Sequence, residues 1–287
     1  MLTRLKKKIP YPLKSKAKLV IHQGRMLNWK SRLTPDFIII GGQKCGTSSL
    51  YNYLAQHPQI LPASKKEIHY FDNGLDSHQK NFERGESWYR AHFPLKNSGR
   101  ESCLTFEASP TYCVNPLVAK RIQEFNPKIK IIFCIRDPKA RAISHYYHEV
   151  MNGREVQPIL KALKLEESRI ENAVNSGKYE DRAFTSFSYK TRGLYADQMQ
   201  RYLDCFDSSQ VHLMSAEDLF SNPERTLKQA YHFLSIDSEF RDLDLKPVNV
   251  SPLKKEVDLD VIRYLDNFFE EPNQRLFELL DRRFDWT

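Results

Sequence analysis

The 287-residue chain has no long apolar run. No stretch reaches the roughly eighteen consecutive apolar residues that a membrane-spanning helix needs, and the N-terminal segment lacks the apolar core of a secretory signal. The five cysteines include no Cys-x-x-Cys pair, so neither a zinc site nor a disulfide framework is predicted. These absences favour a cytoplasmic protein in a reducing compartment, working without a metal.

Acidic side chains are missing from the first 35 residues, which contain ten of the 44 lysines and arginines. The net charge of +8 therefore arises from this segment, since the rest of the chain is close to neutral. We expect residues 1–34 to form a basic N-terminal arm and residues 35–287 to form one domain. A solvated tail is the structure expected for the arm. The alternative is peripheral contact with an anionic surface, and nucleic acid is not an expected partner.

Short apolar runs alternate with amphipathic segments beyond residue 35. The runs predict buried strands, and Asn-Pro and Asp-Pro pairs mark several helix starts. This alternation predicts a single α/β domain with a central parallel sheet flanked by helices. The expected strands are residues 37–40, 104–107, 130–135 and 211–215. The expected helices are residues 48–56, 115–127, 137–150, 158–175, 191–206, 222–236 and 259–281, with a mostly irregular stretch at 57–85.

A glycine-rich segment, GGQKCGTSS at residues 41–49, joins the first expected strand to the first expected helix, where Ser48 or Ser49 is expected to serve as the N-cap. Backbone N–H groups at such a turn, together with the helix dipole, bind phosphate. In the Walker A loop of nucleotide triphosphatases the lysine follows the last glycine, whereas Lys44 precedes Gly46. The segment therefore predicts a phosphate-binding loop of another type.

The segment FIIIGGQKCGTSSLYNYL resembles the 5'-phosphosulfate loop of sulfotransferases that use 3'-phosphoadenosine-5'-phosphosulfate (PAPS). The resemblance is closest to the heparan sulfate and glycosaminoglycan branch and its bacterial relatives, which have a P-loop-kinase-like fold. It implies that Lys44 stabilises the leaving group. It also implies a set of donor-binding residues in the loop: Gln43, Lys44, Cys45, Gly46, Thr47 and Ser48.

A second segment, IIFCIRDPKARAISHYYHEV, resembles the family's 3'-phosphate motif, in which an arginine at a strand end is followed eight residues later by a serine. It implies that Arg136 and Ser144 hold the 3'-phosphate. The planar guanidinium suits phosphate oxygens, and ligands of open α/β sheets bind at strand carboxyl ends. Pairing of Arg136 with a nearby acid is the alternative.

A third segment, KKEIHYFD at residues 65–72, resembles the element that carries the catalytic base of the glycosaminoglycan branch. It implies that Glu67 takes the acceptor's proton, with Lys66, His69 and Asp72 contacting the acceptor or the transferring group. His69 is the rival base, since histidine is the commonest general acid–base side chain.

Two weaker matches and one departure complete the resemblance, which covers about residues 35–287. The sequence RGLY implies that Arg192 and Tyr195 close over the nucleotide, and a buried helix start is the alternative. The stretch FEASPTY has Ala108 where some relatives have lysine. The basic loop that covers the donor in many relatives is missing from residues 246–258, where only Lys254 and Lys255 could replace it.

The resemblance therefore implies a PAPS-dependent sulfotransferase that acts by in-line transfer on a hydroxyl or amine, with a carbohydrate as the expected acceptor. Two other classes stay open at this point. One is a kinase-like phosphotransferase, which would require ATP and magnesium. The other is a non-catalytic protein that binds anionic glycans.

Overall fold

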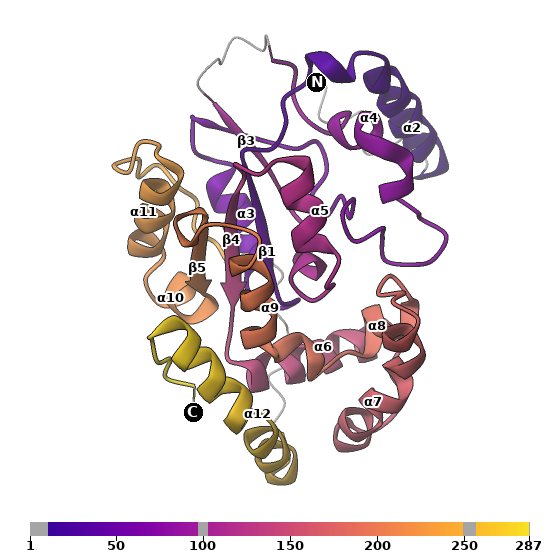
Figure 1. The fold of residues 1–287 in the computed structure, drawn as a ribbon, viewed down its shortest axis with the longest axis vertical. Coiled ribbons are helices and arrows are strands. Elements are labelled where there is room, and N and C mark those ends of the chain that lie inside the picture. The colour runs from indigo at the N-terminus through magenta and orange to yellow at the C-terminus, as the bar shows by residue number, and fades with distance from the viewer. Residues whose placement is uncertain (1–10, 97–102, 249–256, 287) are drawn as a thin grey trace.

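A computed structural model describes residues 11–96, 103–248 and 257–286 of the chain. Its centre is a five-stranded parallel sheet in the order β2-β3-β1-β4-β5 (Figure 1). The strands are β1 (Phe37–Gly41), β2 (Ile60–Pro62), β3 (Leu104–Ala108), β4 (Lys130–Ile135) and β5 (Val211–Ser215). The single α/β domain with a parallel sheet flanked by helices confirms the predicted fold class.

The two central strands are almost wholly buried, which explains their unbroken apolar sequences. All five residues of β1 are buried, as are five of the six in β4. Their register pairs Phe37 with Lys130 and Gly41 with Cys134, so both strands end at the same edge of the sheet. A strand covered by helices on both faces needs side chains that are apolar on both, rather than in alternation.

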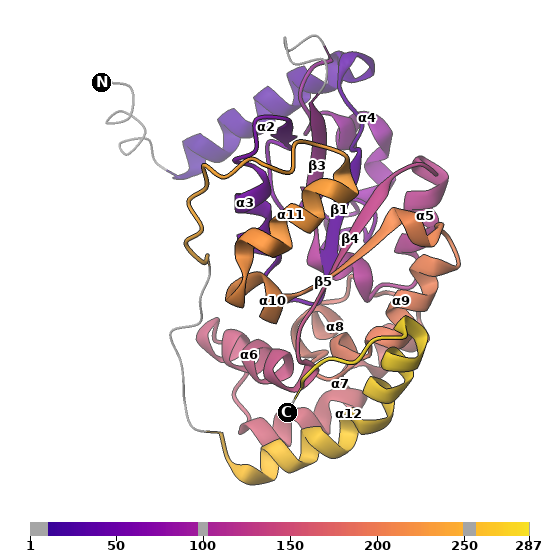
Figure 2. The same ribbon diagram turned by 90° about the vertical axis from the view of Figure 1, so that its left-hand side faces the viewer.

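Helices surround the sheet on both faces (Figure 2). Helices α5 and α9 cover one face, α3 covers the other, and α6, α7, α8 and α12 gather beyond the carboxyl ends of the strands. Their bounds are α2 (Tyr11–Leu27), α3 (Thr47–Leu54), α4 (Gly85–Arg90), α5 (Val118–Phe125), α6 (Pro138–Met151), α7 (Ile159–Asn175), α8 (Arg182–Phe187), α9 (Tyr195–Leu203), α10 (Ala216–Ser221), α11 (Pro223–Leu234) and α12 (Leu259–Leu280).

Local sequence signals set several of these boundaries. Asp137 accepts a hydrogen bond from the backbone N–H of Lys139 and Pro138 opens α6, as the Asp-Pro pair predicted. Asn222 caps α11 in the same way through the N–H of Arg225. The prediction of a serine cap for α3 was wrong, because Gly46 is the N-cap and Ser48 and Ser49 lie inside the helix.

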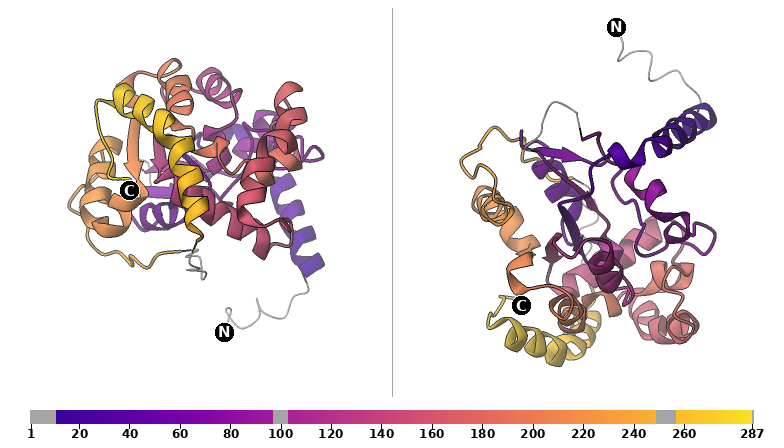
Figure 3. Two further views of the ribbon diagram at one scale, coloured as in Figure 1. Left: turned by 90° about the horizontal axis from the view of Figure 1, so that it is seen from below. Right: turned by 45° about the horizontal axis from the view of Figure 1, so that its top comes forward.

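Five elements were not foreseen, namely strand β2 and helices α2, α4, α8 and α10. The three-residue strand β2 lies at the sheet edge inside the segment expected to be irregular. The arm forms helix α2 where a solvated tail was expected (Figure 3). It is held by ring contacts of His22 with Trp88 and His92, at 5.6 and 4.2 Å between centroids. Buried Arg32 fixes the segment after the helix by donating to the carbonyl of Phe93 at 2.8 Å.

Candidate active site

The loop between β1 and α3 has the backbone of an anion cradle. Gly41 adopts φ +144°, and a Cβ there would lie 2.2 Å from the carbonyl oxygen of Cys134, so the neighbouring strand requires glycine. Lys44 and Gly46 both have φ 78°, in the left-handed region. Left-handed residues in a tight turn aim successive N–H groups to one side, and α3 adds its unpaired N-terminal N–H groups. The loop therefore suits a phosphate or sulfate group.

Buried side chains support this loop from behind. The Cys45 thiol lies 3.5 Å from the hydroxyl of Tyr195, and Arg141 donates to the carbonyls of Gln43, at 3.5 Å, and of Tyr189. Arg192 is only 1% exposed and donates to the Ser188 hydroxyl at 2.7 Å. Tyr195 is equally buried, and the predicted contact of Arg192 and Tyr195 with a nucleotide stays a prediction.

Arg136 follows the last residue of β4 and reaches the same loop. Its guanidinium donates to the carbonyl of Lys44 at 3.2 Å. Within the described part of the chain it forms no ion pair, so the alternative of a simple pairing with a nearby acid does not apply. Ser144 lies half-buried on α6, eight residues further along. The two sequence motifs therefore meet at the carboxyl edge of the sheet.

The segment containing Glu67 is fixed to the end of β3 by backbone hydrogen bonds. The N–H of Glu67 donates to the carbonyl of Ala108 at 3.0 Å, and the N–H of His69 donates to the Ser109 hydroxyl at 3.2 Å. Glu67 and His69 both have positive φ, 59° and 55°. Such conformations cost about 1–3 kcal/mol each in non-glycine residues and persist where the surroundings impose them, often at functional sites.

Four charged side chains of this segment interact closely. His69 Nδ1 lies 2.8 Å from Asp72 Oδ2, and its Nε2 lies 3.9 Å from Glu67 Oε2, an ion-pair separation too long for a hydrogen bond. The ammonium of Lys66 contacts the other oxygen of Glu67. The hydroxyl of Thr111 donates to Asp72, which keeps that carboxylate against the imidazole ring.

These contacts separate the pKa values of the two candidate bases. Burial raises the pKa of Glu67, but the adjacent His69 and Lys66 outweigh it and set this pKa at about 2. Burial lowers the pKa of His69, but Asp72 and Glu67 outweigh it and raise it to about 9. At neutral pH Glu67 is therefore a carboxylate, whereas His69 carries a proton on both ring nitrogens.

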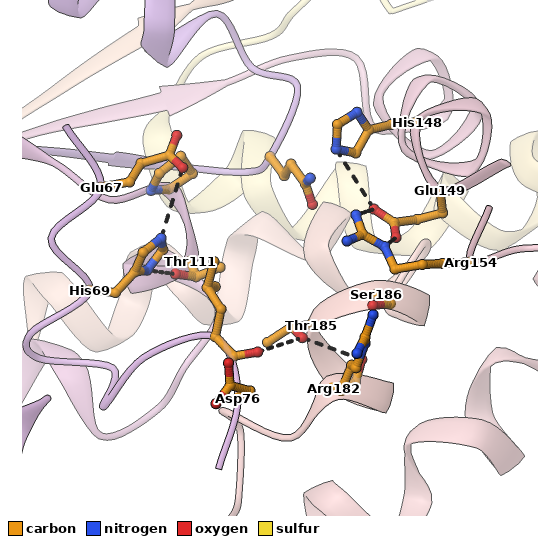
Figure 4. A pocket seen from close by; sticks show the side chains of 13 residues that line it. Glu67, His69, Asp76, Thr111, His148, Glu149, Arg154, Arg182, Thr185 and Ser186 are labelled. Atoms are coloured by element: carbon orange, nitrogen blue, oxygen red, sulfur yellow. Dashed lines mark hydrogen bonds and ion pairs between the residues drawn. The ribbon is translucent and has the colours of Figure 1, made fainter. Parts of the chain in front are cut away.

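A pocket of about 440 Å³ joins the loop to this segment (Figure 4). Gln43 of the loop lines it together with Glu67, His69 and Thr111. Helix α6 and the segments after it supply the opposite wall, where His148 lies 3.9 Å from Glu149 and Arg154 forms an ion pair with the same carboxylate. The remaining lining residues are Leu75, Asp76, Pro110, Arg182, Thr185 and Ser186.

The opposite wall was not anticipated from the sequence. His148 had a usable signal, because it follows Ser144 by four residues and so lies on the same face of α6. Burial lowers the pKa of His148, and the carboxylate of Glu149, 3.9 Å away, partly opposes this shift. Arg154 and Arg182 reach the pocket only through the fold and had no such signal.

The other predicted residues lie around the pocket or outside the described chain. Lys44 is half-buried in the loop, and burial and the charge of Arg136 lower its pKa. Lys254 and Lys255, proposed as replacements for the donor-covering loop, lie outside the described residues. In residues 11–96, 103–248 and 257–286 no group of three or more histidine, cysteine, aspartate or glutamate side chains is arranged to hold a metal ion. None of the helices described there is long and apolar enough to cross a membrane.

The glycine-rich loop after β1, Arg136 after β4 and the pocket lined by Glu67 all lie at the carboxyl edge of the parallel sheet, where open α/β proteins bind their ligands. The family profile described as Sulfotransferase domain matches residues 34–256. The chain therefore belongs to the sulfotransferase family and is a transferase, in agreement with the resemblance of its motifs.

Relatives in three groups of organisms share the fold or sequence. The crystal structure of a sulfotransferase from Alicyclobacillus acidocaldarius has a TM-score of 0.73 and 31% identity, covering 88% of this chain and 98% of that one. Mouse heparan sulfate glucosamine 3-O-sulfotransferase 5 is 28% identical over 88% of this chain and 74% of its own length. The membrane-associated sulfotransferase kil1 of Dictyostelium discoideum is 27% identical over 88% of this chain and 66% of its own.

Proposed function

We propose that this sulfotransferase moves a sulfuryl group from PAPS to a hydroxyl or amine of a carbohydrate, with Glu67 as the base. The observation that carries the proposal is the convergence of Gln43 of the anion-binding loop, Glu67 and His69 in one pocket. Family membership decides against the kinase-like alternative and against a non-catalytic glycan-binding protein.

The donor side of the site fits the two phosphates of PAPS. The loop from Gln43 to Ser48 would hold the 5'-phosphosulfate through backbone N–H groups and hydroxyls. Arg136 would turn its guanidinium from the carbonyl of Lys44 toward the 3'-phosphate, joined by the Ser144 hydroxyl. PAPS supplies an activated sulfuryl group and a phosphate leaving group. We propose that Arg192 and Tyr195 keep the loop in shape.

The protonation states support Glu67 as the base. With a pKa of about 9, only about one His69 in a hundred is neutral at pH 7, whereas Glu67 is ionised. A carboxylate with a pKa of about 2 is a weak base while Lys66 contacts it. We propose that Lys66 moves to the transferring group when the donor binds. This movement removes one of the two cations, His69 and Lys66, that lower the pKa of Glu67, so it raises that pKa and makes the carboxylate a better base for the acceptor's proton.

Each charged group then has one role in the transfer. Glu67 accepts the proton as the acceptor oxygen or nitrogen attacks sulfur, and the bond from sulfur to the leaving phosphate oxygen breaks on the opposite side. Lys44 stabilises the charge that develops on that oxygen. His69, held by Asp72, orients the acceptor as a hydrogen-bond donor.

The pocket supports a sugar as the acceptor. Its walls are rich in groups that exchange hydrogen bonds with hydroxyls, including Asp76, Arg182 and Ser186. Its carboxylates and cations are similar in number, and Glu149 already neutralises Arg154. Such a lining recognises hydroxyls through directional hydrogen bonds. The names of the heparan sulfate relatives point to the same class of acceptor.

Labelled PAPS tested against a panel of glycans and aminoglycans checks this proposal. We expect label transfer to at least one sugar, and loss of that transfer in Glu67→Gln. Binding of adenosine 3',5'-bisphosphate without transfer to any sugar, beside transfer to a phenol or a steroid, would overturn the choice of acceptor and leave the donor assignment standing.

A further inference from the structure

Helix α2 shows two different faces. Its inner face packs on the domain through His22, whose ring contacts Trp88 of α4 and His92. Its outer face has apolar or small residues at positions 17, 20, 24 and 27, all exposed. Because these positions are three or four residues apart, they form one stripe along the helix. A Cβ added at Gly24 would meet no atom within 4 Å, so the stripe is open to solvent along its length.

The exposed apolar side chains of this helix are unusually concentrated. Val20 is 65% exposed and Leu27 is 90% exposed, with Leu19 and Ile21 exposed beside them. Elsewhere large exposed apolar residues are more dispersed, such as Leu117 and Val156. Scattered apolar residues on a surface need no explanation, but a contiguous group on one helix marks an interaction surface.

The charge on the helix is of one sign. Within Tyr11–Leu27 the sequence has three lysines and one arginine and no acid, and residues 1–35 contain no acid at all. An apolar stripe on a helix rich in lysine and arginine is typical of helices that lie in the interface of an anionic bilayer.

Two other possible partners of α2 would satisfy either its apolar stripe or its positive charge, but not both. A second copy of the helix would cover the stripe but would bring two acid-free basic segments together, which is repulsive. A sulfated polysaccharide would neutralise the lysines but would leave Val20 and Leu27 in water. A bilayer with anionic lipids attracts the cations and removes the apolar side chains from water at the same time.

We propose that α2 binds the surface of membranes that contain anionic lipid, with Ala17, Val20 and Leu27 in the interface and the inner face fixed to the domain. The helix lies on the outside of the molecule, at the end opposite α12 (Figures 2 and 3). Trp88 contacts both His22 and Tyr70, and Tyr70 belongs to the same segment as Glu67. The membrane-bound helix and the active site are therefore parts of one packed unit. This inference is independent of the acceptor proposed above.

Sedimentation of the full chain with vesicles tests the inference. The protein should bind vesicles of phosphatidylcholine mixed with phosphatidylserine, and not vesicles of phosphatidylcholine alone. Added salt should weaken this binding, because the cations act through screened electrostatics. The double variant Val20→Asp, Leu27→Asp should bind at least about tenfold more weakly, since two side chains would no longer leave water.

A matched control distinguishes the loss of the apolar stripe from a general effect of added negative charge. Val156 is 83% exposed and lies in the loop after α6, so the double variant Val156→Asp, Leu117→Asp adds the same charge away from α2 and should bind vesicles as the parent does. Melting temperature and turnover on a soluble acceptor should be unchanged in both double variants, because none of these residues lines the pocket.

Three results would overturn the inference. One is equal binding to both kinds of vesicle, and another is undiminished binding of the Val20→Asp, Leu27→Asp variant. The third is a dimer in solution that this variant dissociates, which would assign the stripe to a second copy of the chain.

Discussion

Replacing Glu67 with glutamine removes the proposed base while leaving its surroundings nearly unchanged. The amide has the size of the carboxylate, and its oxygen can still accept a hydrogen bond from Lys66. The side chain is 43% exposed, so no core packing is disturbed. Glutamine tolerates the φ of 59° no better and no worse than glutamate. The substitution therefore tests proton acceptance in particular.

The expected loss follows from the chemistry of the site. General-base catalysis contributes about 10²- to 10⁴-fold, so turnover should fall by that factor, or about 2.7–5.5 kcal/mol of barrier. The carboxylate of Asp72, which the substitution leaves in place, still raises the pKa of His69 and disfavours this histidine as a replacement base. Binding of adenosine 3',5'-bisphosphate should change little, since Glu67 is not part of the phosphate-binding loop.

Single-turnover transfer of labelled sulfate measures the loss, and calorimetry with the bisphosphate measures donor-site binding. Glu83→Gln is a matched control, because Glu83 is an exposed glutamate of the same region whose only described ion pair is with Lys80, at 3.4 Å. The control should retain parental turnover.

The pH dependence of turnover distinguishes the two bases again. With Glu67 as the base, turnover should be level between about pH 5 and 8 and should fall as His69 loses its proton near pH 9. A His69 base predicts the opposite, a rise of about tenfold per pH unit up to pH 9. A near-normal Glu67→Gln enzyme beside an inactive His69→Gln enzyme would refute the assignment.

Three further predictions follow from the donor side and from His69. Adenosine 3',5'-bisphosphate should bind more tightly than AMP, and Arg136→Ala should remove most of that preference in calorimetry, whereas equal parental affinities would contradict the 3'-phosphate site. Lys44→Ala should lower single-turnover transfer by about 10²- to 10³-fold through lost leaving-group stabilisation, and unchanged transfer would exclude that role. Folding raises the pKa of His69 from 6.5 to about 9, so its stabilisation, on the order of 3 kcal/mol at most, is fully present below pH 6.5 and lost as pH rises through 9. His69→Gln should therefore flatten the fall in melting temperature over this range, and an equally steep fall in the variant would show that another group titrates.

The sequence by itself determined the elements whose signals are local. Strand β4 was predicted with its observed bounds, because its apolar run lies between a Pro-Lys turn and an Asp-Pro helix start, and both are local signals. The start of α11 followed from Asn-Pro in the same way. The phosphate-binding loop could also be located, since a glycine-rich turn between a strand and a helix is a local feature.

Local signals were insufficient where burial decides the outcome. The arm looked like a solvated tail, because its charge suggests hydration, yet His22 and Arg32 fix it against α4 and the segment after it. Gly46 displaced the serines as the cap of α3, because the loop needs its left-handed backbone there. Strand β2 has only three residues and exists because β3 lies beside it.

The candidate site also contains residues that local sequence motifs identify and residues that only the tertiary structure identifies. Glu67, His69 and Lys44 could be named from the sequence because they occur in short contiguous motifs. Only the tertiary structure brought Arg154 and Arg182 to the pocket and buried Arg192, since these residues are more than a hundred positions from Lys44 along the chain. The protonation states of Glu67 and His69 also required the structure, because a pKa depends on burial and on the distances to neighbouring charges.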